Sequence, residues 1–116
     1  MRHHSNKRKF GREMTQRNAL MRSLARNLIR DTRIKTTTAK AKELRPFVEK
    51  LVTKAKVATV ASRRLVQSKI MGAPETKKLF AEIAPKYADR KGGYIRIMKL
   101  PNRDLDGSPM SLIEFV

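Results

Sequence analysis

Three arginines recur at helical spacing in the first third of the chain. Arg22, Arg26 and Arg30 stand at positions i, i+4 and i+8, which places them along one face of an α-helix. No Asp or Glu is interleaved at that spacing to neutralise them, which is unusual for a helix face that meets only water. A row of guanidinium groups can hold nucleic-acid phosphates, because each group donates paired hydrogen bonds to phosphate oxygens. A solvated face is the alternative, and the pattern favours phosphate.

The overall charge also indicates a polyanionic partner. The 116 residues include 28 Lys and Arg against 10 Asp and Glu, so the net charge is +18 at pH 7. Such an excess disfavours compactness through self-repulsion, and a nucleic acid relieves it. Residues 1–12 are basic and nearly lack apolar side chains. We therefore expect a basic extension that orders on RNA, with a solvated tail as the alternative.

Other kinds of chemistry have little support in the sequence. The chain has no Cys, and its only two histidines, His3 and His4, lie among cationic residues, so no metal site is expected. No G-x-x-x-x-G-K motif and no apolar run of about 18 residues occurs. The acidic residues of the expected helices fall on separate polar faces, which gives no catalytic carboxylate pair: Glu43, Glu49, Glu75 and Glu82. We expect no enzymatic activity, cofactor, small-molecule substrate or membrane span.

The elements that position the basic groups follow from apolar periodicity. The first expected helix runs from Met14 to Asp31, with its apolar side, centred on Leu20, Leu24 and Leu28, opposite the arginines. Core packing should require these leucines, and nothing in the fold should require the arginines. The central helix is predicted by one apolar series: Leu44, Phe47, Val48, Leu51, Val52 and Ala55. Pro46 leaves two alternatives, a start near Arg45 or a start at Thr38 with a bend.

The rest of the chain predicts two more helices and three strands. Residues 59–70 form a helix whose apolar positions are Val60, Ala61, Leu65, Val66 and Ile70. A further helix begins at Pro74 and is bent or ended by Pro85. Strands are expected at residues 33–37, as an edge strand, and at 94–100 and 110–116, as a hairpin. The predicted class is α+β: about four helices on a small, mostly antiparallel sheet of about three strands, forming one domain over residues 13–116.

Aromatic side chains are too few for a surface that reads single strands by stacking. Of 4 Phe and 2 Tyr, only Phe10 and Tyr94 are not assigned to the core and could stack on bases. Binding is therefore expected through phosphate and shape. Gly92 and Gly93 have two interpretations that stay open: a helix stop before a strand, or close backbone approach to a phosphate beside Arg90 and Lys91.

Several blocks of the sequence resemble the family of bacterial large-subunit ribosomal protein seventeen. They are MRH at 1–3, KFGR at 9–12, RIKTTTAKAKELRP at 33–46, KLF at 78–80, APKYADRKGGYIRI at 84–97 and PMSLIEFV at 109–116. The resemblance covers nearly the whole chain in order. It implies an α+β domain with a basic N-terminal extension. It also implies a non-catalytic protein of the cytoplasmic ribosome that binds large-subunit ribosomal RNA, lies against neighbouring large-subunit proteins, and supports subunit assembly and translation.

The expected RNA contacts come from the extension, the first helix, the strand and helix that follow, the third helix and the Gly-Gly turn. In chain order they are Arg2, His3, Lys7, Arg8, Lys9, Arg12, Arg17, Arg22, Arg26, Arg30, Lys35, Thr36, Lys40, Arg63, Arg64, Arg90, Lys91, Gly93 and Tyr94. A small DNA-binding nucleoid protein is the main alternative. It is disfavoured because the sequence shows no convincing short-turn helix pair with base-reading side chains at a recognition-helix start. An RNA-processing enzyme would need titrating groups gathered in one site.

Overall fold

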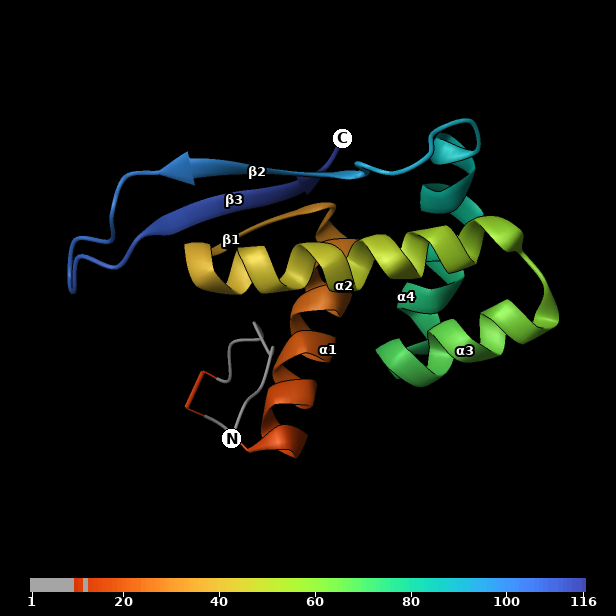
Figure 1. Cartoon of the computed structure of the whole chain (residues 1–116), viewed down its shortest axis with the longest axis horizontal. Helices are drawn as coiled ribbons and strands as arrows, with labels where there is room; N and C mark the ends of the chain where they lie inside the picture. The colour runs from red at the N-terminus through yellow and green to blue at the C-terminus, as the bar shows by residue number, and fades with distance from the viewer. Residues whose placement is uncertain (1–9, 12) are drawn as a thin grey trace, which may run out of the picture.

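A computed structural model of the chain describes residues 10, 11 and 13–116 (Figure 1). The helical elements are α1 (Met14–Asp31), α2 (Thr38–Val57), α3 (Val60–Ile70), α4 (Ala73–Lys78), a π-helical turn η1 (Leu79–Ile83) and a 3-10 turn η2 (Ala84–Tyr87). The strands are β1 (Arg33–Thr37), β2 (Ile95–Leu100) and β3 (Met110–Phe115). The predicted α+β class, with four helices and a three-stranded sheet, is confirmed.

The elements stack around α2. Figure 1 shows the sheet on one side of α2 and α1, α3 and α4 on the other. Residues from α1, α2, α3, η1, η2 and two strands join in one buried cluster, in which Leu28, Leu44 and Ile113 have no exposed surface. The far face of the sheet carries no helix within the described part of the chain. The central helix predicted from the sequence is thus the element on which the others pack.

The sheet has the order β1-β3-β2 and is antiparallel throughout. β1 therefore lies at an edge, as predicted, and β2 and β3 form the predicted hairpin. The register places Ile34, Ile113 and Ile97 in one row across the strands, and this row faces the core. The alternation along each strand then sends the next row outward, and it includes Lys35 and Met98, both exposed.

α2 begins at Thr38 and continues through Pro46, so the alternative start near Arg45 is wrong. The hydroxyl of Thr37 accepts a hydrogen bond from the Lys40 amide at 3.5 Å, and the Thr38 amide donates to the Pro109 carbonyl at 3.0 Å. These bonds satisfy first-turn amides that have no helical partner. Pro46 is exposed, so water can reach the carbonyl that its missing amide leaves unpaired.

The fourth helix starts as predicted but changes its winding before Pro85. The Ala84 amide donates to the carbonyl of Leu79, five residues earlier, which is the hydrogen bond of a π-helical turn. Pro85 has no amide hydrogen, and its ring crowds the carbonyl four residues before it. The α-helix therefore ends at Lys78. The wider π-helical turn η1 follows it, and the narrower 3-10 turn η2 comes next, so the helix does not simply bend at Pro85.

The expected apolar face of the third helix is wrong in part. Val66 and Ile70 are buried, but Val60 is 68% and Leu65 is 51% exposed. Leu65 stands roughly 100–140° around the helix from the two buried residues, so it cannot share their face. α3 thus has apolar side chains on two sides, of which one meets the core.

Candidate nucleic-acid interface

α1 separates its core residues from part of its arginine row, as the spacing predicted. Ala25, Leu28 and Ile29 are buried, whereas Arg22 is half-buried and Arg30 is exposed. The Arg30 guanidinium donates to both carboxylate oxygens of Asp31, at 3.1 and 3.2 Å, and this lowers the pKa of Asp31. Both side chains are solvated, so the pair is weak and leaves Arg30 able to bind a phosphate.

Arg26 differs from the other two arginines because its half-buried side chain is hydrogen-bonded to the end of another helix. Its Nη1 donates to the Ile70 carbonyl at 2.9 Å and to the Met71 carbonyl at 3.4 Å. The carbonyl groups at the end of a helix lack helical partners, and a cation there is favoured by the helix dipole. The expectation that nothing in the fold requires these arginines is therefore wrong for Arg26. A Cβ on Gly72 would lie 2.8 Å from Cδ of Arg26, so this glycine admits the side chain.

The turn that contains Gly92 and Gly93 is held against α2 by hydrogen bonds. Lys56 Nζ donates to the Arg90 carbonyl and, at 3.0 Å, to the Tyr94 hydroxyl. The Tyr94 amide donates to Glu49 Oε2 at 3.3 Å. Gly92 has φ +131° and Gly93 has φ +62°, conformations that favour glycine. The turn into β2 explains both glycines, while approach to a phosphate stays a prediction.

Tyr94 is a core residue, and the interpretation of its ring as a base-stacking surface is wrong. The residue is 2% exposed, and its ring centroid lies 5.3 Å from that of Tyr87. The hydrogen bond from Lys56 to its hydroxyl lowers the pKa of Tyr94. The sequence placed Tyr94 at the start of a strand without revealing that the turn before the strand folds its ring against α2.

The other predicted contact residues are distributed over the surface. Arg17 and Lys40 are half-buried in α1 and α2, while Lys35, Arg64 and the pair Arg90 and Lys91 are exposed. Gly93 is exposed and Thr36 is half-buried. The predicted contacts Arg2, His3, Lys7, Arg8, Lys9 and Arg12 lie outside the described residues.

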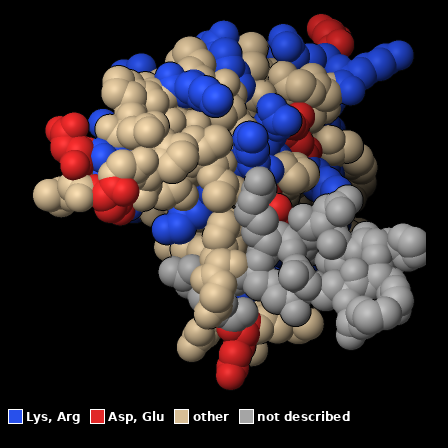
Figure 2. Space-filling view, turned by 60° about the vertical axis from the view of Figure 1, so that its left-hand side comes forward, with Lys and Arg blue, Asp and Glu red and all other residues tan. Residues whose placement is uncertain are grey.

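The structure does not gather these groups into one pocket. In Figure 1, α1 lies below the middle of α2, α3 lies below its right-hand end, and the turn around residues 90–93 lies above that end. Figure 2 shows Lys and Arg side chains spread over one face, with most visible carboxylates toward its edges. A dispersed basic surface suits an extended polyanion better than a small ligand.

Sequence reasoning missed a hollow at the start of α2. It has a volume of about 500 Å³, and its lining includes Thr37, Lys42 and Lys99. Lys99 comes to α2 because it pairs with Ser111 of β3, which in turn pairs with Thr36 of β1. No local pattern could have joined Lys42 to Lys99, since their proximity depends on the register of three strands.

Two structural features of the described residues bear on other functions. Among residues 10, 11 and 13–116, no three His, Cys, Asp or Glu side chains gather closely enough to hold a metal ion. None of the helices built from these residues is both long and apolar enough to cross a membrane.

A small α+β fold with a dispersed basic surface and solvent-accessible arginines on one helix is typical of a protein that binds the phosphate backbone of a nucleic acid. Comparison with known proteins identifies the family. The family model described as ribosomal protein L17 matches residues 20–116, and the chain belongs to this family. The resemblance seen in the sequence is therefore confirmed.

Individual relatives match over almost the full length. The chain is 51% identical to the large ribosomal subunit protein bL17 of Methylacidiphilum infernorum (isolate V4), over 99% of this chain and 88% of the relative. It is 50% identical to the protein of the same name from Hydrogenobaculum sp. (strain Y04AAS1), over 100% of this chain and 99% of the relative.

Proposed function

We propose that the chain is a structural constituent of the large ribosomal subunit, where it binds ribosomal RNA and supports subunit assembly and translation in the cytoplasm. The observation that carries this proposal is the match at about half identity, over essentially the whole chain, to relatives named as large ribosomal subunit proteins. Its role is structural and not catalytic. Neighbouring large-subunit proteins are its other partners.

The proposed RNA contacts are made to phosphates by the outward arginines of α1 and the basic residues around them. Arg22 and Arg30 are the central pair, because Arg30 is exposed and the Arg22 side chain is only partly buried. Arg17, Lys35 and Lys40 extend this surface, and Arg90, Lys91 and Gly93 provide a second one. The basic residues of positions 2–12 add further positive charge, since the sequence has no Asp or Glu among positions 1–12. Arg26 supports this surface by positioning α1 and does not itself bind RNA.

The DNA-binding alternative meets a specific obstacle in the helices. α3 follows α2, and α4 follows α3, after only two residues, as in a helix-turn-helix pair. The second helix of each pair begins with residues 60–62 or 73–75, which are Val-Ala-Ser and Ala-Pro-Glu. None of these can make the paired hydrogen bonds with base edges that Arg, Asn or Gln make, and the Glu would face phosphate charge.

Co-sedimentation tests the proposed function directly. Cells producing an epitope-tagged chain are lysed, and large subunits are purified through a moderate-salt wash. The tagged chain should stay with the large subunit at about one copy per particle, because several phosphate contacts together resist moderate salt. Loss of the chain to the soluble fraction, or sedimentation with DNA after ribonuclease treatment, would contradict the proposal.

A further inference from the structure

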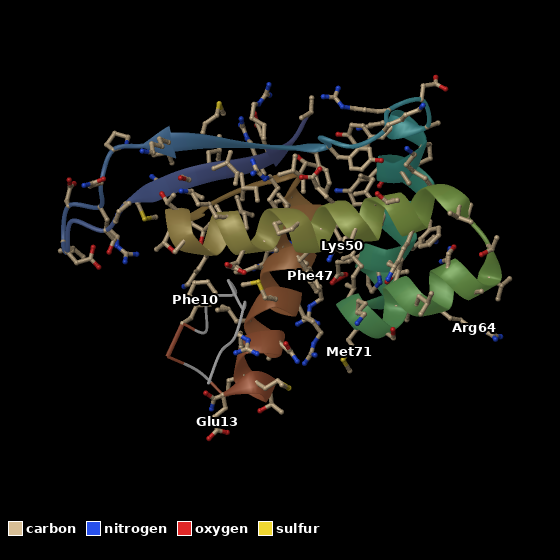
Figure 3. The ribbon with its side chains drawn as sticks, in the orientation of Figure 1. Phe10, Glu13, Phe47, Lys50, Arg64 and Met71 are labelled. Carbon is tan, nitrogen blue, oxygen red and sulfur yellow. The ribbon has the colours of Figure 1, made fainter. Side chains whose placement is uncertain are left out.

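α3 has an apolar face turned away from the protein. This outer face of α3 consists of Val60, Leu65 and Met71, which are 68%, 51% and 61% exposed, together with Arg64. Val60 lies roughly 40° to one side of Arg64 around the helix and Leu65 roughly 100° to the other, and Met71 directly follows the last residue of α3. Figure 3 shows Arg64 and Met71 pointing outward from α3, away from the rest of the molecule. Single exposed apolar residues are normal, but several on the outward half of one short helix and at its end mark an interaction surface.

A shallow hollow beside this face contains two guanidinium groups. It has a volume of about 410 Å³ and is lined by Val60, Arg63, Arg64, Gln67 and Ser68, with no carboxylate among them. The Arg63 guanidinium lies 5.3 Å from the centroid of the Phe80 ring, which restricts its position. Guanidinium groups bind carboxylates through paired hydrogen bonds, so the hollow is suited to an Asp or Glu side chain flanked by apolar residues.

We propose that the outer face of α3 binds an acidic, apolar segment of another protein of the large subunit. RNA phosphate would satisfy the arginines but would leave three large apolar side chains unburied. The face also has no aromatic ring on which a base could stack. A second copy of the chain is disfavoured because each copy carries a net charge of +18 and α3 contains no acidic residue. Charge complementarity therefore selects an acidic protein segment.

The face can be altered without changing the core. α3 is held to the protein by Ser62, Val66 and Ile70, which are buried. Replacing the exposed Val60, Leu65 and Met71 should therefore leave the fold intact. The inference rests on the proposed place in the large subunit, but it is independent of the arginine row of α1 as an RNA contact.

A site-specific cross-link tests the inference in the assembled particle. The photoreactive residue p-benzoylphenylalanine replaces Leu65 in a chain incorporated into large subunits, which are purified and irradiated. The expected product is heavier than the 13.3 kDa chain, resists ribonuclease and is destroyed by protease. Mass spectrometry should place the link within an Asp- or Glu-containing apolar segment of a different large-subunit protein. A link to RNA, a link to a second copy, or no link from a chain retained in the subunit would overturn the inference.

Charge-matched variants test the chemistry of recognition. Arg63→Gln with Arg64→Gln should lower the cross-link yield at least about fivefold, because two charge-assisted contacts are lost. Lys86→Gln with Lys77→Gln removes the same charge from exposed positions elsewhere and should leave the yield unchanged. If the two double variants lowered the cross-link yield equally, the inference that Arg63 and Arg64 recognise acidic side chains would be overturned.

A last variant separates protein binding from RNA binding. Val60→Ser, Leu65→Ser and Met71→Ser together should leave affinity for protein-free large-subunit RNA within about twofold, since no charge changes. A tenfold loss would show that the face contacts RNA, and the inference would fail. If the unaltered chain were missing from large subunits, the proposed function would fail as well, an outcome distinct from all the others.

Discussion

Arg26 and Ile70, 44 positions apart in the sequence, are joined by a hydrogen bond of 2.9 Å from the guanidinium Nη1 to the backbone carbonyl oxygen. The bond ties the middle of α1 to the end of α3. It divides the arginine row of α1 by function, because Arg26 is used within the fold and Arg22 and Arg30 remain on the surface. A row that looks uniform in the sequence is thus partly structural.

The first prediction concerns this bond. Arg26→Gln should lower the free energy of unfolding by about 1–2 kcal/mol, because a half-buried carbonyl loses a charged donor. The Arg22 side chain makes no hydrogen bond to another described residue, so Arg22→Gln should change stability by less than about 0.5 kcal/mol. Urea denaturation measures both variants. Equal stability of the two would show that the bond to Ile70 has no net effect.

The second prediction concerns the glycine beneath Arg26. In Gly72→Ala the new methyl group would lie 2.8 Å from Cδ of Arg26 and 2.9 Å from Oε1 of Glu75, so the arginine must move. The substitution should cost about 1 kcal/mol in the wild-type background and clearly less together with Arg26→Ala, because alanine has no Cδ for the new methyl group to displace. A double-mutant cycle by urea denaturation measures the difference. Strict additivity would mean that the two residues are not coupled.

The regular elements could be predicted because their signals are local. The bounds of α1 and the edge position of β1 follow from apolar spacing and short strand segments, and the structure agrees with both. Arg26 and Tyr94 could not be assigned correctly, because their partners Ile70 and Lys56 lie 44 and 38 positions away. The outward position of Leu65 depends on which side of α3 meets the core, and tertiary packing decides this.

The third prediction concerns the core along α2. Leu51 is 2% exposed, so Leu51→Ala should lower the free energy of unfolding by about 2–5 kcal/mol through lost burial and a cavity. Leu105 is 96% exposed in the hairpin loop, and Leu105→Ala is the matched control, which should be nearly neutral. Thermal and urea denaturation measure both. A harmless Leu51→Ala would mean that α2 is not the element on which the core is built.

The fourth prediction concerns the two neighbouring tyrosines. Burial raises the pKa of Tyr87, whereas the hydrogen bond from Lys56 lowers the pKa of Tyr94. Tyr94 should therefore ionise first in an alkaline titration followed by phenolate absorbance. Tyr94→Phe should remove the earlier step and Tyr87→Phe the later one. The reverse order of ionisation would show that burial affects the pKa of Tyr94 more than the hydrogen bond from Lys56 does.

The same shifts set the direction of the pH effect on stability. Because the folded pKa of Tyr87 is raised, its contribution is complete below the unfolded pKa and is lost as pH rises through the folded pKa. The lowered pKa of Tyr94 acts oppositely, since its contribution is present above the unfolded pKa and is lost as pH falls through the folded pKa. Tyr87→Phe should therefore weaken the loss of stability at alkaline pH, measured by urea denaturation at successive pH values.

The salt dependence of RNA binding tests the central claim, that the outward arginines of α1 contact ribosomal RNA phosphates. Arg22→Gln with Arg30→Gln removes two charges and, by circular dichroism, should leave the fold native, because helix propensity changes little. The slope of log affinity for large-subunit RNA against log salt concentration should shrink by about 1.4–1.8 units, the effect of two lost phosphate contacts. Lys77→Gln with Lys86→Gln, an equal loss of charge elsewhere, should change it much less. An unchanged slope and affinity in the arginine variant would show that this face of α1 meets solvent.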